Sequence, residues 1–481
     1  MRPPRYLMRP PRAGSVIRFA RWLSVATAVS LAAACAVGPD YHRPKLDVAP
    51  DYKEAGDWKP SEPNDALSRG PWWEIFNDDV LNQLEIRIDI SNENVKAAAA
   101  AYDQARALVA QARAGFWPTV GVSAARTHGA VAGEPTHITD SAGISANWDL
   151  DIWGRIRRTT ESNRASAQAS AAALAAARLS AQAALATDYF ELRAQDQLQK
   201  LLDDIVVAEQ LSLKIAESRY HFGVAARADV VSAEAQLLSS QAQQVNAKIQ
   251  RAVLEHAIAV LIGQQPATFS VSPSSMRADV PTVPAGIPST LLERRPDVAE
   301  AERNIAAANA QIGVAKSAFF PSLTLSGSDD YTGRTWSRFF SVPNRVWSLG
   351  PSLAETLIDG GLRRAQVAQA RAAYDASVDN YRQTVLAGFE QVEDDIVTLR
   401  VLEQQAVIED AAVAAAREAE KLTLNQYKAG TVPYSSVITA QTTRLSSEQT
   451  ALAVLSSRLQ ASVALIEAVG GGWTASQLPL P

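Results

Sequence analysis

Apolar residues recur every seven positions along several stretches of this chain, a spacing typical of helices that pack along a shared seam. The stretches 157–220 and 362–427 contain no proline and consist mainly of Ala, Leu, Gln, Glu and Arg, which are strong helix formers. At 1.5 Å per residue, each continuous helix would be on the order of 100 Å long. The pattern therefore predicts two coiled-coil-like helices much longer than those of a globular domain. The second contains the series Val378, Val385, Val392, Leu399, Ala406 and Val413.

Other regions alternate apolar with polar residues, which is the period of a β-strand. Residues 119–125 and 144–150 predict one hairpin, and residues 322–326 and 347–353 predict a second. Four strands cannot close a transmembrane barrel, because a barrel needs every edge paired. Three chains would supply twelve strands, a number within the range of outer-membrane barrels. We therefore predict a mainly α protein whose four strands per chain form a twelve-stranded transmembrane β-barrel in a trimer; a four-stranded soluble sheet is the alternative.

The two halves of the chain repeat each other at a distance of about two hundred residues, which indicates an internal duplication. The segment 114–118 returns as 317–321, and 220–223 returns as 427–430. The heptad positions also correspond, so a duplicated buried helix seam is predicted. These positions are Val231, Leu238, Val245, Ala252 and Ala259 in the first copy, and Ile438, Leu445, Leu452, Leu459 and Ile466 in the second.

The N-terminus reads as a secretory signal. The first 34 residues contain six arginines and no acidic residue, then a short apolar run that is too short to span a membrane. Without those six arginines the formal charge of the chain changes from −5 to −11, so the mature chain is acidic and does not favour nucleic-acid binding. The predicted organisation is a signal peptide (1–34), a lipidated arm (35–79), a first repeat (80–267), a proline-rich linker (268–292), a second repeat (293–472) and a C-terminal tail (473–481).

Cys35 is the only cysteine, and it follows the apolar run directly. This is where a bacterial lipoprotein carries its acylated residue, so we interpret Cys35 as a lipid anchor; an incidental buried thiol is the alternative. A multiply acylated cysteine holds a protein firmly to a membrane. An intrachain disulfide is impossible with one cysteine.

Catalytic and metal-binding signatures are missing from the sequence. The five histidines show no zinc-ligand spacing, and there is no nucleophile elbow, Walker loop or dinucleotide fingerprint. We therefore expect no enzyme activity, metal or cofactor. The acidic cluster of Glu390, Glu393, Asp394 and Asp395 is interpreted as a solvated face.

Several motifs together resemble one family. Residues 291–298 read Leu-Leu-Glu-Arg-Arg-Pro-Asp-Val, residues 357–361 read Leu-Ile-Asp-Gly-Gly, and residues 470–473 read Gly-Gly-Gly-Trp. With Cys35-Ala-Val-Gly-Pro-Asp-Tyr41, they resemble the TolC-like outer-membrane efflux family, in its NodT-like lipoprotein branch. The resemblance implies a trimeric channel in the bacterial outer membrane that extends into the periplasm. Its implied role is a passive conduit that exports small toxic compounds, with a periplasmic adaptor and an inner-membrane pump, commonly of the resistance-nodulation-division class.

The resemblance also implies sites at the ends of the long helices. Tyr220 to Gly223 and Tyr427 to Gly430 would form the turns at the periplasmic tip, where the adaptor docks. Family members often close this tip with charged side chains, but the corresponding positions here are Ser435, Thr439 and Thr442. We keep these as gate candidates, with Arg227 and Asp229 of the first copy as possible sources of charge. Two alternatives are a coiled-coil lipoprotein that tethers periplasmic partners without a pore, and the outer channel of a type I protein secretion system.

Overall fold

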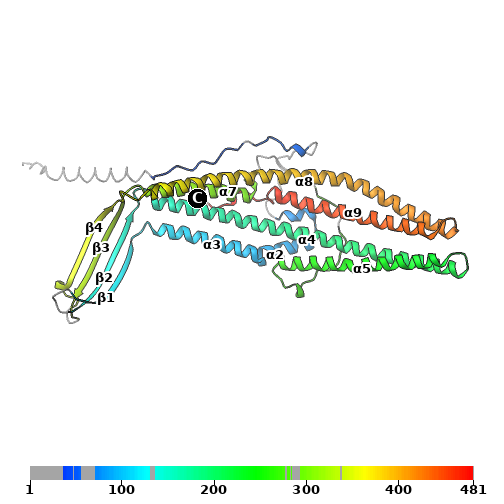
Figure 1. The fold of residues 1–481 in the computed structure, drawn as a ribbon, viewed down its shortest axis with the longest axis horizontal. Coiled ribbons are helices and arrows are strands. Elements are labelled where there is room, and N and C mark those ends of the chain that lie inside the picture. Colours follow the sequence, from blue (N-terminus) through cyan, green and yellow to red (C-terminus); the bar gives the residue numbers. More distant parts are fainter. Residues whose placement is uncertain are drawn as a thin grey trace, which may run out of the picture.

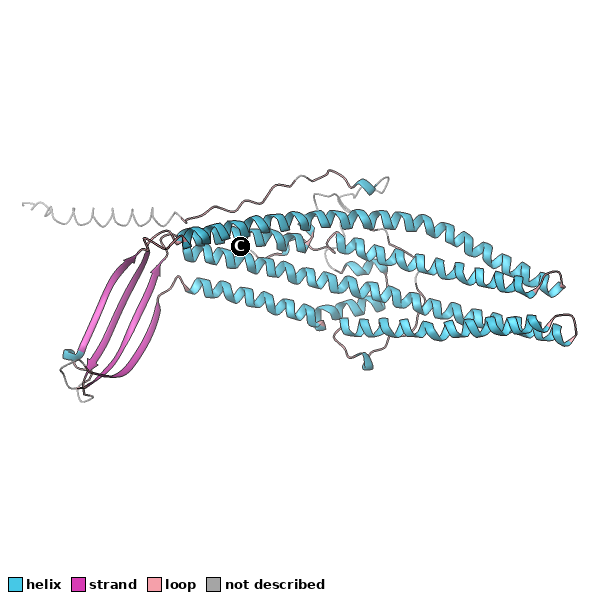
Figure 2. Cartoon of the chain, viewed as in Figure 1, coloured by secondary structure: helices cyan, strands magenta, loops and turns pink. Residues whose placement is uncertain are grey.

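The molecule is a long rod with a small sheet at one end (Figure 1). The computed structural model describes residues 36–46, 48–55, 71–130, 136–276, 279–281, 283, 293–335 and 339–479. The predicted signal peptide and Cys35 lie outside the described residues. The strands occupy one end, and the helices run from them to the opposite end, where two turns lie close together (Figures 1 and 2).

The two long helices predicted from the sequence are confirmed. Helix α4 spans Arg155–His221 (67 residues) and α8 spans Leu362–Ala429 (68 residues). Each starts after a glycine in the left-handed region, at φ 81° for Gly154 and 96° for Gly361. Among the described residues, the other α-helices are α2 (Asp79–Ser91), α3 (Glu93–Ala114), α5 (Arg227–Leu261), α7 (Pro296–Ser317) and α9 (Tyr434–Ala468). The short 3₁₀ helices are η1 (Lys53–Ala55), η2 (Trp72–Phe76), η3 (Pro266–Thr268), η4 (Val342–Asn344) and η5 (Ala475–Gln477).

The predicted hairpins form one antiparallel sheet in the order β1-β2-β3-β4. Its strands are β1 (Thr119–Gly129), β2 (His137–Leu150), β3 (Ser322–Gly333) and β4 (Arg345–Ala354). Val122 pairs with Ile144, and Trp148 pairs with Leu325, so large apolar side chains share one face. Serine, threonine and glycine dominate the other face, as expected for a wet lumen inside a membrane barrel. In the described chain β1 pairs only with β2, and β4 pairs only with β3, so each leaves one edge of the sheet unpaired. Closure of a barrel therefore needs neighbouring protomers.

The helices change partners halfway along the rod. Next to the sheet, α3, α4, α7 and α8 lie side by side. In the distal half, α4 pairs with α5 and α8 pairs with α9, and α4 also contacts α9 (Figure 1). Alanine-rich windows of α4 and α9 are long and apolar enough to cross a membrane by composition, but both helices belong to this bundle.

The heptad prediction holds for α8 and α9 and is largely wrong for α5. Val385 and Val392 of α8 are buried, as is Ile466 of α9. On α5, however, Leu238 is 57% exposed and Val245 is 62% exposed. The physical reason is position, because α5 lies at the edge of the protomer and packs mainly on α4. Of the predicted series only Ala259 is fully buried, and the buried residues of α5 are Ala233, Leu237, Ser240, Leu254, Ile258 and Ala259.

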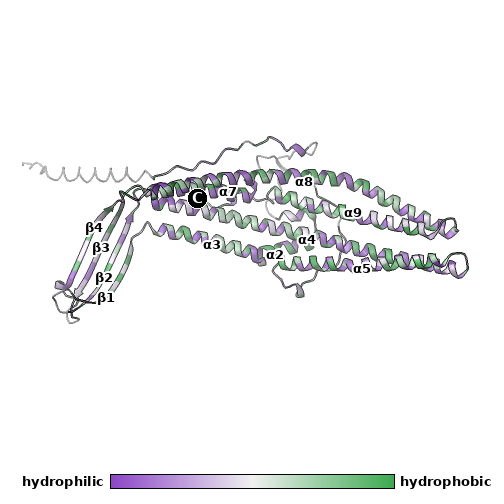
Figure 3. Cartoon of the chain, in the orientation of Figure 1, coloured by the Kyte–Doolittle hydropathy of each residue, from purple (hydrophilic) through white to green (hydrophobic). Residues whose placement is uncertain are grey.

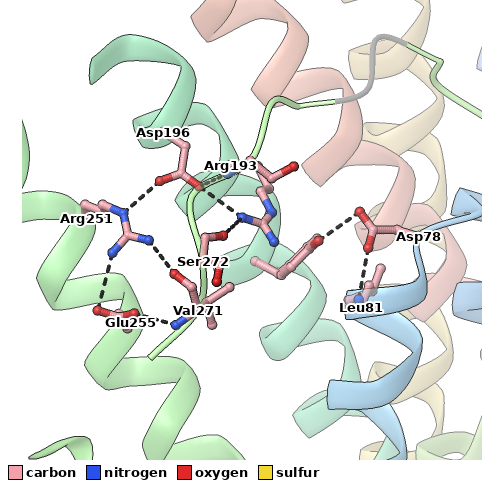
Figure 4. A network of polar contacts seen from close by, with 10 residues as sticks. Asp78, Leu81, Arg193, Asp196, Arg251, Glu255, Val271 and Ser272 are labelled. Atoms are coloured by element: carbon pink, nitrogen blue, oxygen red, sulfur yellow. Dashed lines mark hydrogen bonds and ion pairs between the residues drawn. The ribbon is translucent and has the colours of Figure 1, made fainter. Parts of the chain in front are cut away.

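In the middle of the rod, polar contacts attach the start of the linker to α4 and α5 (Figure 4). Asp196 of α4 accepts hydrogen bonds from Arg193 (3.0 Å) and from Arg251 of α5 (2.7 Å). The same two arginines donate to the carbonyl oxygens of Ser272 (2.8 Å) and Val271 (2.6 Å). Charge-assisted bonds of this kind fix the start of the linker on both helices.

A second group of contacts explains two of the sequence motifs. The buried Arg295 donates to Gln391 of α8 (2.8 Å) and to the Ala468 carbonyl at the end of α9 (3.0 Å). Gly470 follows α9 at φ 95°, and a Cβ there would lie 2.1 Å from the Arg294 carbonyl oxygen. The arginine pair and the glycine run therefore pack directly on each other.

Candidate tip, gate and membrane anchor

The distal end of the rod consists of two similar helix ends (Figure 1). Gly223 (φ 71°) ends the first, and Gly430 (φ 79°) ends the second. In both, an amide beyond the glycine bonds back to a carbonyl five residues earlier: Val224 to Arg219 (2.9 Å), and Thr431 to Gln426 (3.0 Å). These are the left-handed helix ends for which glycine is preferred, and nothing lies within 4 Å of a Cβ built on Gly223.

The two tip tyrosines are in different environments. Tyr427 is buried, and its ring packs edge-on against Tyr434 with centroids 5.1 Å apart. The Arg219 guanidinium lies 4.9 Å from the Tyr427 ring centroid and donates to the Lys428 carbonyl (2.7 Å). Tyr220 is exposed instead. Burial therefore excludes the Tyr427 side chain from a docking surface, while its backbone shapes the turn.

The Tyr427 hydroxyl links the helical hairpin α8–α9 to the helical hairpin α4–α5 by donating to Asp229 of α5 (3.4 Å). Burial, followed by the Asp229 charge, raises the pKa of Tyr427. Asp229, a gate candidate from the sequence, is therefore half-buried and engaged within its own protomer. Arg227 is exposed at the start of α5.

Ser435, Thr439 and Thr442 are all exposed and lie on one face of α9. The Thr439 hydroxyl donates to the Ser435 carbonyl within the helix (3.0 Å). The structure thus groups the three hydroxyl residues, but it places them on a different surface from the contact between Tyr427 and Asp229. Arg219 was missed by the sequence reasoning, because nothing in its local sequence distinguishes it from the other arginines of α4.

The arm after Cys35 is attached where the sheet meets the helices. The Val37 amide donates to the Trp153 carbonyl (3.1 Å), and a Cβ on Gly154 would lie 2.9 Å from the Ala36 Cβ. Farther along, Asp40 pairs with the buried Arg158 of α4 (3.0 Å). The first described residue of the arm is therefore held at the junction of β2 and α4.

The end of the arm contacts the acidic cluster of α8. Glu393 accepts the backbone amides of Lys53 (2.7 Å) and Glu54 (2.9 Å), and Arg400 pairs with the Glu54 carboxylate (2.8 Å). Part of the cluster interpreted as a solvated face thus holds the arm. Among the described residues, no group of three metal-ligating side chains comes together.

Hydrophobic and hydrophilic residues are interspersed along the four strands, as the hydropathy colouring shows (Figure 3), and several of the large apolar ones are exposed, such as Val122, Trp347 and Leu349. Exposed apolar strand residues of this kind are typical of a membrane-embedded sheet. Residues 87–264 and 287–471, which cover most of the helices and all four strands, match the family described as outer membrane efflux protein. The chain belongs to the outer membrane efflux protein family.

Known proteins match this chain over most of its length. The toluene efflux pump outer membrane protein TtgC of Pseudomonas putida is 27% identical over 462 residues, which cover 94% of this chain and 95% of the relative. Nodulation protein T of Rhizobium leguminosarum bv. viciae is 30% identical over 471 residues and 95% of both chains. The solved outer-membrane channel OprN is 31% identical, with a TM-score of 0.83 over 91% of this chain and all of that one.

These matches confirm the fold and the function expected from the sequence. The protein is an outer-membrane efflux channel of a tripartite pump, a trimer that extends into the periplasm, and it is not an enzyme. It acts with pump partners. Neither a soluble four-stranded sheet nor a tether without a pore agrees with this result.

Proposed function

We propose that this channel receives its cargo from a periplasmic adaptor and an inner-membrane pump of the resistance-nodulation-division class, and exports small toxic compounds passively. The cargo class is supported by the relative named as a toluene efflux channel. The outer channel of a type I secretion system is the alternative; the cysteine after the apolar run favours the efflux branch.

The adaptor docks on the first tip turn. The observation that carries this proposal is the exposed apolar group at the far end of the rod: Phe222 is 74% exposed and Val224 is 63% exposed, beside the exposed Tyr220. Exposed apolar side chains gathered on a turn at the end of the rod are typical of a protein–protein contact. Gly223 and Gly430 give both turns the shape that the adaptor meets.

The gate has an inner and an axial part. Within each protomer, the α8–α9 hairpin is held against the α4–α5 hairpin by Arg219, Tyr427 and Asp229. On the axis of the trimer, the exposed hydroxyl face of Ser435, Thr439 and Thr442 forms the narrow ring, with Arg227 nearby. Opening then separates the hairpins and widens that ring.

Cys35 carries the lipid anchor, a proposal supported by the position of its neighbours. Ala36 and Val37 lie at the junction of β2 and α4. Exposed apolar residues surround this level of the molecule, as expected at a membrane surface. They are Trp117, Phe319, Phe320, Leu357 and Ile358. Acyl chains on residue 35 would therefore enter the periplasmic leaflet without stretching the arm.

Native mass spectrometry of the protein extracted from membranes tests assembly and anchor together. We expect a trimer in which every chain carries acyl mass on Cys35, and in which Cys35→Ser removes the mass. An unmodified wild-type chain would overturn the anchor.

The proposed pump partnership is tested by co-expression with an adaptor and a resistance-nodulation-division pump in a host that lacks its own outer channel, with toluene tolerance as readout. Gly223→Val should abolish the tolerance, whereas Gly350→Ala, where a Cβ has nothing within 4 Å, should keep it. Tolerance that survives Gly223→Val contradicts the proposed docking turn.

A further inference from the structure

Buried polar side chains lie where the α4–α5 hairpin meets the α8–α9 hairpin. Glu209 of α4 is 2% exposed, and Ser240 of α5 and Gln441 of α9 are also buried. Gln441 donates to Ser212 of α4 across the contact (3.1 Å). We call this region, formed by Glu209, Ser212, Ser240, Glu420 and Gln441, the polar seam. Buried polar groups reduce stability unless they are fully hydrogen-bonded. An incompletely hydrogen-bonded seam therefore favours two arrangements of the hairpins, one packed together and one separated.

Glu209 is the incompletely bonded member of the seam. Its Oε1 accepts a hydrogen bond from Gln236 of α5 (3.0 Å). Its Oε2 is sealed from solvent and makes no hydrogen bond of normal geometry among the described residues, although the Ser240 hydroxyl lies near enough to lower the pKa of Glu209. An ionised carboxylate in this position has lost most of its hydration without full replacement.

The groups that face Glu209 do not neutralise it. From α5 come the neutral side chains of Gln236 and Ser240, from α8 the acidic Glu420, and from α9 the hydroxyl of Tyr434. The nearby cation, Arg444 of α9, pairs with Glu420 (2.7 Å) and with Glu448 (3.2 Å).

Burial raises the pKa of Glu209 above its usual 4.5; the side chains of Gln236 and Ser240 oppose this rise in part, and the Glu420 charge adds to it. We propose that Glu209 is a proton-dependent latch between the two hairpins of each protomer, closed when protonated and released when ionised. The proposal rests on the proposed gate, because the same two hairpins must separate for the channel to open.

The direction of the effect follows from linkage. Separating the hairpins returns water to Glu209, so its pKa falls back toward 4.5 in the separated state. The closed state therefore binds the proton more tightly, and acidification stabilises closure. Raising the pH through the closed-state pKa ionises Glu209 beside Glu420 and favours separation. Acidic conditions should hold an idle channel shut.

The test measures hairpin distance and conductance separately on the full-length trimer. Because Cys35 is the only native cysteine and is proposed to be acylated, spin labels can be placed on cysteines introduced at Ala226 and Thr431, which are exposed on the two tip turns. Pulsed electron spin resonance then reports the distance between the turns at pH 5 to 8, and planar bilayers report conductance over the same range. Glu209→Gln keeps the shape but cannot ionise. Glu217→Gln, at an exposed position of the same helix, is the matched control.

We expect the wild type and Glu217→Gln to show a longer distance and a higher conductance as the pH rises, with a midpoint above 4.5. Glu209→Gln should lose both responses and remain closed. Glu420→Gln removes the repelling charge and should shift the midpoint to lower pH. A Glu209→Gln variant with the wild-type pH response in distance would overturn the latch, as would a wild type whose distance does not change with pH. A distance that responds while conductance stays constant would support the latch and contradict the proposed gate.

Discussion

Tyr220 and Tyr427 occupy equivalent positions in the two repeats, yet Tyr220 is 45% exposed and Tyr427 only 2% exposed. The difference arises because the α8–α9 hairpin lies against α4, which brings Arg219 over the Tyr427 ring; in the described part of the chain no cation lies over the Tyr220 ring. The duplication therefore produced two turns of the same shape with different roles. One offers an apolar surface, and the other is a buried joint.

Replacement of Tyr427 by alanine should loosen the tip. Truncating a buried aromatic residue reduces stability by roughly 3 kcal/mol or more, and here it also removes the packing surface of Arg219 and Tyr434. We expect faster amide hydrogen exchange across residues 424–438 and a higher conductance of the isolated trimer. Tyr220→Ala is the control, and it should change neither quantity. Equal effects of the two substitutions would contradict the asymmetry.

The exposed apolar stripe on α5 should mediate contact between protomers. Leu238 and Val245 face away from their own hairpin, and α5 is at one edge of the protomer, so a neighbouring chain is the natural partner. We expect Val245→Asp to prevent trimer formation, because it places a charge in an apolar contact. Size-exclusion chromatography with light scattering measures the subunit count. Glu234→Asp, at an exposed position of the same helix, should leave the trimer intact; a Val245→Asp trimer of normal stability would disprove this role.

The fold was predictable to the extent that it depends on local periodicity. Alternation located the strands, and the absence of proline located α4 and α8, because both signals act within a few residues. Which face of α5 is buried was not predictable, because its series of apolar heptad positions resembles that of α9. Only the arrangement of the neighbouring helices decides whether such a series is buried within the protomer or exposed on its surface. At the tip, glycine fixed the turns, but the contacts of Arg219 and the burial of Glu209 depend on residues about two hundred positions away.

The glycine after α9 should be irreplaceable. Gly470 adopts φ 95°, and a Cβ would meet the Arg294 carbonyl oxygen at 2.1 Å. A side chain there is strained and must displace the arginine pair, which we expect to reduce stability by roughly 2 kcal/mol or more. Gly470→Ala should lower the temperature at which the trimer loses its helical circular dichroism. Gly350→Ala is the control. A Gly470→Ala protein that unfolds at the same temperature as that control would show that the contact between residue 470 and Arg294 tolerates a side chain.

Glu85 should make stability depend on pH. It is fully buried on α2, and neither carboxylate oxygen has a hydrogen-bond partner among the described residues. Burial, followed by the charge of Asp89, raises the pKa of Glu85 to about 9. Between pH 4.5 and 9 the folded protein keeps this proton and the unfolded chain releases it, so raising the pH favours unfolding. At pH 7 the cost is roughly 3 kcal/mol.

Replacing Glu85 by methionine removes the titrating group at similar volume. The variant should unfold at a higher denaturant concentration than the wild type at pH 7, and the advantage should shrink as the pH falls toward 4.5. Glu403→Met, at an exposed position of α8, controls for the loss of one carboxylate and should leave the pH dependence unchanged. If Glu85→Met keeps the wild-type slope of stability against pH, another group binds the proton, and the carboxyl of Glu85 finds a partner in the trimer.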